Sequence, residues 1–295
     1  MASWQMHLAD AIIRTAVKPQ LVGGRDLIQV RALSGYGAFP IPKGAQFHET
    51  ALGGVAGEWV TPTQLGTSAA TLVYFHGGGY FSGSPRAHRP ISASFAKAGF
   101  NVFVPDYRLA PEHPYPAAVD DAEAVWDALT RSGHLEIAVA GDSAGGGLAL
   151  ALMLRLRAKA KLMPFAAALF SPWTDLLLSG ESLYANAQSD ALFDASGVQT
   201  AAEWYLNGAD PQTPEASPLY GSLGGFPPLF IEVGEREILR DDSTRLAERA
   251  WSQGVNATIN LWPAVCHVWQ LACSFLPEGR RSLDQTASFL HATRP

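Results

Sequence analysis

Residues 137–147 read IAVAGDSAGGG, and they carry the strongest structural signal in the sequence. A short apolar run enters Gly-Asp-Ser-Ala-Gly and a long apolar helical pattern follows, which predicts a strand, a sharp turn and a helix. Ser143 lies at the turn, and Gly141 and Gly145 leave room for the strained backbone that such a serine adopts. The simpler interpretation is a glycine-rich turn with an incidental serine, so the rest of the chain has to decide between the two.

The composition indicates a globular protein with a sizeable core. The 295 residues are 47% hydrophobic and 16% charged, and the net charge is −6. An acidic chain without a basic cluster is not expected to bind nucleic acid. The N-terminus lacks the pattern of a secretory signal, and no apolar run approaches about 18 residues, so we expect no membrane span. The two cysteines indicate a reducing compartment, and we expect a cytoplasmic protein.

Strand patterns alternate with helix patterns along most of the chain. Besides the strand before Ser143, apolar runs predict strands at 46–50, 57–61, 72–76, 100–106, 165–170, 229–233 and 257–261. Helices are predicted at 90–98, 116–131, 144–161, 243–253 and 283–290. This alternation predicts an α/β fold with a mostly parallel central sheet and helices on both faces.

Two segments depart from this alternation. The first places apolar residues at helical spacing from Trp4 to Val17, with no sheet partner nearby. The second, at 172–226, is too long for a loop between two strands and predicts part of a lid. We therefore divide the chain into N-terminal cap helices at 1–45, a catalytic core at 46–171 and 227–295, and a cap insertion at 172–226.

A second glycine-rich turn, HGGGY at 76–80, follows a predicted strand upstream of the serine. Successive glycines allow backbone N–H groups to face a carbonyl oxygen. The turn therefore predicts an oxyanion hole formed by the N–H groups of Gly77, Gly78 and Ala144. A Gly-Gly-Gly turn by itself is more often a flexible connection. Its spacing does not match the G-x-G-x-x-G of dinucleotide sites.

A serine nucleophile needs a histidine base from farther along the chain. Of the eight histidines, His267 and His291 lie downstream of the seventh predicted strand. His267 follows the eighth strand, so we expect it at the same edge of the sheet as Ser143. His291 lies near the end of a terminal helix and is expected to be solvated. Cys266 has no positive neighbour and is expected to pack in the interior, as is Cys273.

Five motifs occur in the order and at the spacing of a known family. They are HGGGY at 76–80, DYRLAPEHPYPAA at 106–118, GDSAGG at 141–146, SPWTDL at 171–176 and HVWQ at 267–270. With them the chain resembles the hormone-sensitive-lipase-like carboxylesterases, the bacterial family IV, in its GDSAG branch. The resemblance implies an α/β-hydrolase fold, a cap built from N-terminal helices and the insertion after the sixth strand, and hydrolysis of short acyl esters.

The resemblance also implies roles for residues outside the turn. Asp106 and Arg108 are expected to hold the oxyanion loop and the neighbouring turn in place. Relatives often dimerise through the edge strand, which by analogy gives a homodimer near residues 257–261.

The triad acid has three candidates. Many relatives carry Asp-Pro-Leu-x-Asp after the seventh strand, where this chain reads EILRDD at 237–242. Glu237 takes the position of the first aspartate and can orient a histidine. Asp241 and Asp242 are rivals, but they precede the helix predicted at 243–253, where N-cap residues lie. We therefore predict Glu237 as the acid and the two aspartates as helix caps.

These residues predict a serine carboxylesterase that hydrolyses short-to-medium-chain acyl esters of small molecules through an acyl-enzyme. Tyr80, Phe81, Trp204 and Tyr205 are expected to wall the substrate pocket. The mechanism requires no metal and no organic cofactor, and no cysteine–histidine cluster has ligand spacing. Two alternatives stay open. One is an amidase or formamidase with the same triad, and the other, less favoured, is a non-catalytic receptor on a hydrolase scaffold.

Overall fold

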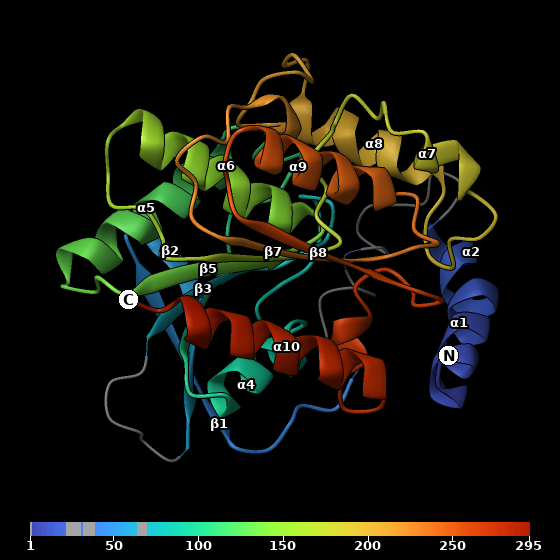
Figure 1. Ribbon diagram of the computed structural model, residues 1–295, viewed down its shortest axis with the longest axis horizontal. Helices are drawn as coiled ribbons and strands as arrows, with labels where there is room; N and C mark the ends of the chain where they lie inside the picture. The colour runs from blue at the N-terminus through green and yellow to red at the C-terminus, as the bar shows by residue number, and fades with distance from the viewer. Residues whose placement is uncertain (1, 22–30, 32–38, 64–69) are drawn as a thin grey trace.

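The computed structural model describes residues 2–21, 31, 39–63 and 70–295. Within them eight strands form one sheet in the order β1-β2-β4-β3-β5-β6-β7-β8 (Figure 1). From β1 to β8 the strands are Ala45–Leu52, Val55–Pro62, Thr71–Phe75, Asn101–Pro105, Ile137–Asp142, Ala167–Phe170, Leu229–Gly234 and Ala257–Trp262. Strand β2 is antiparallel to β1 and β4, and the other pairings are parallel. The predicted mostly parallel sheet is confirmed.

The strand order reverses between β3 and β5, which are neighbours in the sheet although β4 separates them in sequence. Phe75 at the end of β3 lies opposite Gly141 near the end of β5. Loops that follow two adjacent parallel strands leave the sheet at the same edge, where α/β sheets bind their ligands. The topology therefore brings the glycine-rich turn after β3 next to Ser143.

Helices cover both faces of the sheet (Figure 1). One face carries α5 (Ala117–Arg131), α6 (Ala144–Ala158) and α9 (Arg240–Ser252), and the other carries α4 (Arg89–Lys97) and α10 (Pro277–Thr293). Val73 and Phe75 of β3 pack toward the first layer, and Leu72 and Tyr74 pack toward the second. Because both faces of the strand are buried, its sequence is a continuous apolar run. In the part of the chain that the structure describes, no helix has the length and apolar character to cross a membrane.

The predicted helices occur, but several of their ends differ from the prediction. α6 ends at Ala158 rather than at residue 161, since Ala160 adopts a left-handed φ of 49°. α9 begins at Arg240 rather than at residue 243. α10 begins at Pro277 rather than at residue 283, because the fixed φ of proline suits the first position of a helix.

The N-terminal segment continues as helix through Pro19, beyond the apolar pattern that ends at Val17. It consists of α1 (Trp4–Ile12), a π-helical turn η1 (Ile13–Val17) and α2 (Lys18–Leu21). The Lys18 N–H donates to the carbonyl of Ile13, five residues back, so the helix widens just before Pro19, which has no N–H to donate. Residues 22–30 and 32–38 of the predicted N-terminal cap lie outside the described residues.

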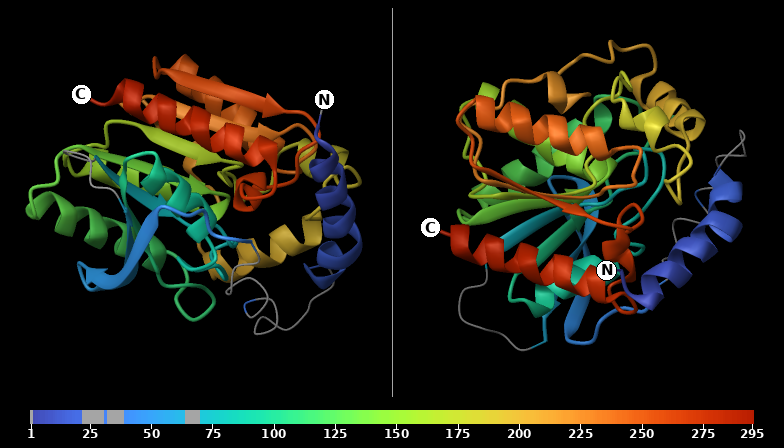
Figure 2. Two further views of the ribbon diagram at one scale, coloured as in Figure 1. Left: turned by 90° about the horizontal axis from the view of Figure 1, so that it is seen from below. Right: turned by 45° about the vertical axis from the view of Figure 1, so that its right-hand side comes forward.

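The predicted insertion lies between β6 and β7. It contains α7 (Ser182–Ala185), α8 (Ala195–Leu206) and the 3-10 turn η2 (Pro218–Tyr220). The N-terminal helices and α7–α8 lie at the end of the sheet toward which the parallel strands run (Figures 1 and 2). Lys18 Nζ donates to the Asp190 carbonyl at 2.8 Å, and Arg14 Nη1 donates to that of Gln188 at 2.9 Å. Hydrogen bonds thus join the two parts of the predicted cap.

Candidate active site

Ser143 lies at the turn between β5 and α6. Its φ of 52° and ψ of −122° form a conformation that non-glycine residues rarely adopt. A Cβ on Gly141 would lie 2.4 Å from the Gly145 carbonyl oxygen, and one on Gly145 would lie 2.0 Å from that of Phe75. The Ser143 N–H donates to the Phe170 carbonyl at 2.8 Å, which ties the turn to the end of β6. The turn therefore has the local geometry of the elbow that GDSAG predicts.

His267, after β8, pairs with Glu237, after β7. Nδ1 of His267 is 2.6 Å from Oε2 of Glu237, and both side chains are buried. An ionised carboxylate only accepts hydrogen bonds, so Nδ1 carries the proton and Nε2 is left as an acceptor. Nε2 is buried and has no hydrogen-bond partner among the described residues. The ring is therefore arranged to receive a proton from outside the pair.

Glu237 is fixed through its other oxygen. Oε1 accepts from Ser171 Oγ at 2.7 Å and from the Gly234 N–H at 2.6 Å. Ser171 directly follows β6. Hydrogen bonds therefore link the loops after β5, β6, β7 and β8 one to the next, and they place Ser143 and His267 at the same edge of the sheet. The sequence analysis assigned no role to Ser171, although it is the first residue of SPWTDL.

Opposing effects act on the pKa of His267. Burial lowers the pKa because the imidazolium loses its hydration, while the charge of Glu237 and its hydrogen bond raise it. The pKa ends above the ordinary value for histidine. The ring of Phe193, from the insertion, packs edge-on against His267 with centroids 4.9 Å apart. Phe193 was not among the predicted pocket residues, and no motif singles it out.

Asp241 and Asp242 do not cap α9, so that prediction is wrong. The helix begins before both of them, and its N-cap residue, Leu239, makes no side-chain hydrogen bond. Their carboxylates accept main-chain N–H groups of the insertion at 2.7–2.9 Å, from Ser182 for Asp241 and from Thr174 and Asp175 for Asp242. Burial raises the pKa of Asp242 to about 7. The two aspartates therefore fasten the insertion to α9.

The turn after β3 offers N–H groups, but not the pair that was predicted. The Gly77 N–H donates to Asp142 Oδ1 at 3.0 Å, so it is already occupied. The N–H groups of Gly78, Gly79 and Ala144 have no acceptor among the described residues. Gly78 and Gly79 have φ of 123° and 61°, which glycine adopts without steric cost. The structure thus offers Gly79 in place of Gly77.

Tyr107 holds this turn, rather than Asp106 and Arg108 as the resemblance implied. Its hydroxyl donates to the His76 carbonyl at 2.7 Å, and its ring stacks on the His76 ring with centroids 4.3 Å apart. Asp106 and Arg108 are exposed because side chains alternate along an extended segment. Arg108 instead pairs with Asp121 of α5 at 2.7 Å.

The four predicted pocket aromatics separate into two pairs. Tyr80 and Tyr205 stack with centroids 3.8 Å apart, and each is only 1% exposed. They pack the glycine-rich turn against α8 rather than wall an open pocket, which corrects the prediction for these two. Phe81 and Trp204 meet edge to face at 5.3 Å and are partly exposed.

The cysteines and the second downstream histidine have no part in this arrangement. Cys266 and Cys273 are buried, as predicted, and burial raises the pKa of both thiols. His291 is exposed and lies 2.8 Å from the Ala98 carbonyl oxygen. Within the residues that the structure describes, His, Cys, Asp and Glu side chains form no group suited to a metal ion.

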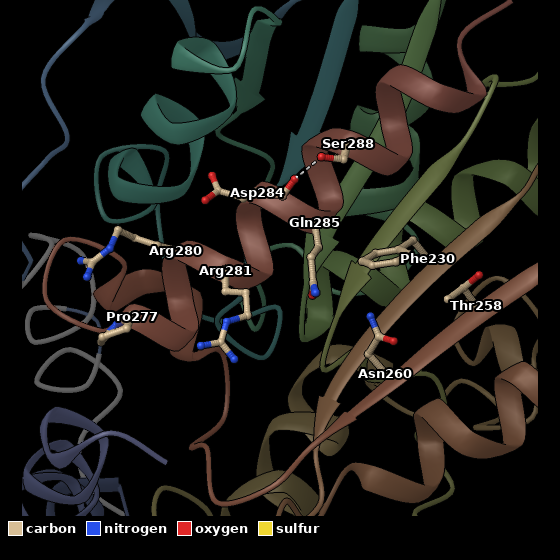
Figure 3. A pocket seen from close by; sticks show the side chains of 9 residues that line it. All are labelled: Phe230, Thr258, Asn260, Pro277, Arg280, Arg281, Asp284, Gln285 and Ser288. Carbon is tan, nitrogen blue, oxygen red and sulfur yellow. Dashed lines mark hydrogen bonds between the residues drawn. The ribbon is translucent and has the colours of Figure 1, made fainter. Parts of the chain in front are cut away.

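A separate hollow of about 700 Å³ lies between α10, β7 and the edge strand β8 (Figure 3). Arg280, Arg281 and Asp284 of α10 and Asn260 of β8 are on its wall. None of the predicted site residues lines it, so it does not mark the place where a substrate meets Ser143.

The sheet, the strained serine and the histidine–carboxylate pair define an enzyme of the α/β-hydrolase class. A family model described as "alpha/beta hydrolase fold" matches residues 72–271. The chain is 40% identical to an acetyl-hydrolase of Streptomyces hygroscopicus, over 98% of this chain and 97% of the relative. It is 38% identical to an esterase of Acinetobacter venetianus, over 85% of this chain and 84% of the relative.

Solved structures agree with these relatives. A crystal structure of EstE5 has a TM-score of 0.95 at 34% identity, and an esterase from the bacterial hormone-sensitive lipase family has 0.92 at 37%. Each match covers 99% of both chains. The chain therefore belongs to the hormone-sensitive-lipase-like esterases, the bacterial family IV of the α/β hydrolases.

Proposed function

We propose that this chain is a carboxylesterase for short-to-medium-chain acyl esters, with Ser143, His267 and Glu237 as its triad. The observation that carries the proposal is the buried His267–Glu237 pair, whose unpartnered Nε2 lies at the sheet edge that also bears the strained Ser143. The names of the relatives, acetyl-hydrolase and esterase, support the reaction class.

The reaction proceeds through an acyl-enzyme. His267 Nε2 accepts the proton of Ser143 Oγ as this oxygen attacks the ester carbonyl, and the imidazolium then protonates the leaving alcohol. In the second half, His267 takes a proton from water, the hydroxide attacks the acyl carbon, and Ser143 leaves with that proton. Glu237 keeps the proton on Nδ1 and stabilises the imidazolium, while its bonds to Ser171 and Gly234 fix its orientation.

The negative oxygen of each tetrahedral intermediate is held by the N–H groups of Gly78, Gly79 and Ala144. These donors have no competing acceptor among the described residues, so they are available to the substrate. Ala144 is the first residue of α6, where the helix dipole also favours a negative charge. Loss of one such donor typically lowers kcat by about 10²- to 10³-fold.

The insertion and the N-terminal helices form a cap that limits the acyl chain. Phe193 of the insertion contacts His267, and hydrogen bonds from Arg14 and Lys18 hold the neighbouring segment. By the family resemblance, we expect activity to be highest with acyl chains of roughly four to eight carbons, because a cap over the site would exclude longer chains. One solved structure of EstE5 is of a crystal soaked with p-nitrophenyl butyrate, a short-chain ester.

The experiment that tests the proposal is hydrolysis of p-nitrophenyl butyrate by wild type and by Ser143→Ala. The variant should lose at least about 10³-fold in kcat. Ser132→Ala changes an exposed serine at the C-terminal end of α5 and should leave kcat unaffected. Phenylmethylsulfonyl fluoride should label the wild type and not Ser143→Ala. An active Ser143→Ala enzyme would refute the proposal.

The same assay separates the alternative functions. An amidase would hydrolyse butyryl p-nitroanilide with a kcat/KM at least equal to that for the ester. A non-catalytic receptor would turn over neither substrate, although it contained the serine and the histidine.

For assembly we propose a homodimer through the edge strand β8, in which Leu261 is 45% exposed. Light scattering after size exclusion should give twice the chain mass for wild type and the single mass for Leu261→Lys. A monomeric wild type would contradict this assembly.

A further inference from the structure

A cluster of buried ionisable side chains lies beneath the glycine-rich turn, and the mechanism above does not use it. Its members are Tyr74, His76, His88, Tyr107 and Asp142, each at most 5% exposed. They come from β3, the turn itself, the residue before α4, the segment after β4 and the end of β5. Asp142 directly precedes the catalytic serine, so the cluster adjoins the reacting atoms.

Asp142 connects the two turns of the site. Its Oδ1 accepts from Tyr74 Oη at 2.6 Å and from the Gly77 N–H at 3.0 Å, and its Oδ2 lies 3.4 Å from His88 Nε2. A Cβ on Gly77 would lie 2.1 Å from Oδ2, so this approach requires glycine. Asp142 thus fixes the residue that precedes the two free N–H donors of the turn.

The partners of His88 define its charge. Its Nδ1 is 3.0 Å from the Ser84 carbonyl oxygen, and its Nε2 faces the Asp142 carboxylate. Both of these oxygens only accept hydrogen bonds, so both ring nitrogens of His88 carry protons and the ring is an imidazolium. Its neighbour in sequence, Arg89, pairs with Glu58 and does not enter the cluster.

The other members of the cluster are neutral. His76 donates from Nδ1 to the Gly77 carbonyl oxygen at 2.8 Å, its Nε2 has no partner among the described residues, and burial lowers its pKa to about 3. Burial raises the pKa values of Tyr74 and Tyr107. The ionised groups of the cluster are therefore Asp142 and His88, whose charges cancel.

We propose that protonated His88 is a positioning residue of the esterase reaction. Its positive charge offsets the negative charge of Asp142, so this carboxylate holds the Gly77 N–H without repelling the oxyanion. In a water-poor interior, an unbalanced carboxylate beside the N–H donors would repel the negative oxygen of the intermediate and would itself tend to take up a proton. The pKa of Asp142 agrees with this balance: burial would raise it, but the charge of His88 brings it below its ordinary value. The inference rests on the function proposed above.

The test is a cycle of His88→Gln and Asp142→Asn. In His88→Gln the carboxylate is unbalanced, so kcat for p-nitrophenyl butyrate should fall about 10- to 100-fold while KM changes less than about threefold. Asp142→Asn should be mild, since the amide oxygen still accepts from Gly77 and the amide nitrogen donates to a neutral His88. The double variant restores charge balance and should recover most of the kcat lost in His88→Gln. His48→Gln, an exposed histidine on β1, is the matched control.

A merely structural role gives a different pattern. In that case the double variant would be no better than His88→Gln, and this result, like an unchanged kcat in His88→Gln, overturns the inference. If His88→Gln does not fold, ¹⁵N NMR of the wild-type histidines decides: His88 should be an imidazolium and His76 neutral at pH 7.5, and a neutral His88 overturns the inference. Failure of the proposed function is distinguishable, because it appears as activity in Ser143→Ala.

Discussion

The substitution Glu237→Gln keeps the size of the side chain but reverses one hydrogen bond. Oε1 accepts from Ser171 and Gly234, so the amide oxygen of glutamine is expected there and the amide nitrogen faces His267. This nitrogen only donates, so Nδ1 must become the acceptor and the ring proton moves to Nε2. His267 then cannot take the proton from Ser143.

The size of the effect follows from this change of tautomer. The corresponding aspartate-to-asparagine exchange in trypsin lowers kcat about 10⁴-fold, and we expect a similar loss here, equivalent to about 5.4 kcal/mol of transition-state stabilisation. The pH profile should move as well. Glu237 raises the pKa of His267, and the base acts only when neutral, so wild-type kcat/KM should rise with pH through that raised pKa. In the variant this rise should occur at lower pH.

The assay is the initial rate of p-nitrophenyl butyrate hydrolysis between about pH 5 and pH 9. Asp242→Asn is the matched control, because its carboxylate is also buried after β7 but is bonded to the insertion. Its kcat should stay within about threefold of wild type. The reasoning is refuted if Glu237→Gln keeps more than about a tenth of the wild-type kcat, or if Asp242→Asn loses as much as Glu237→Gln.

Three further predictions address the acyl chain, the cap and the pH dependence of stability. Across p-nitrophenyl esters from acetyl to palmitoyl, kcat/KM should peak at roughly four to eight carbons and be very low beyond about twelve; a maximum at palmitoyl would contradict a closed cap. Deleting residues 1–20 removes the hydrogen bonds that Arg14 and Lys18 donate to the insertion, so acyl selectivity and Tm should both change. Sulfonyl fluoride should still label Ser143. Unchanged selectivity and Tm would contradict a role of this helix in the cap. Burial raises the pKa of Asp242 from 3.8 to about 7, so its ionisation as pH rises through this range lowers stability. Asp242→Asn should therefore raise Tm, relative to wild type, more at pH 8 than at pH 5, and an equal difference at both pH values in scanning fluorimetry would speak against a buried charge.

Much of the site follows from local sequence signals. A strained serine requires small residues on both sides, so GDSAG singles out Ser143 as the candidate nucleophile without any tertiary information. Parallel strands end at a common edge, so the position of His267 after the last strand was enough to place it there. The choice of Glu237 came from its position in the family motif and from the interpretation of Asp241 and Asp242 as helix caps. The structure brings its carboxylate to 2.6 Å from Nδ1 of His267.

The errors occurred where a role depends on partners distant in sequence. The Gly77 N–H is occupied by Asp142, which β5 carries to the side of β3, and nothing in HGGG itself distinguishes Gly77 from Gly79. Asp241 and Asp242 resembled helix caps because the N–H groups that donate to them belong to the insertion and are remote in the chain.

Strand periodicity and the turn residues of the elbow act over a few positions, so the sequence was sufficient to predict the α/β order of elements, the proposed nucleophile and the family. Tertiary structure alone decided which N–H groups are free, that Tyr107 rather than Asp106 braces the turn, and that Phe193 contacts His267. A hydrogen-bond donor is available only if no other group reaches it, and in a packed α/β domain those groups come from strands, loops and insertions that are far apart along the chain.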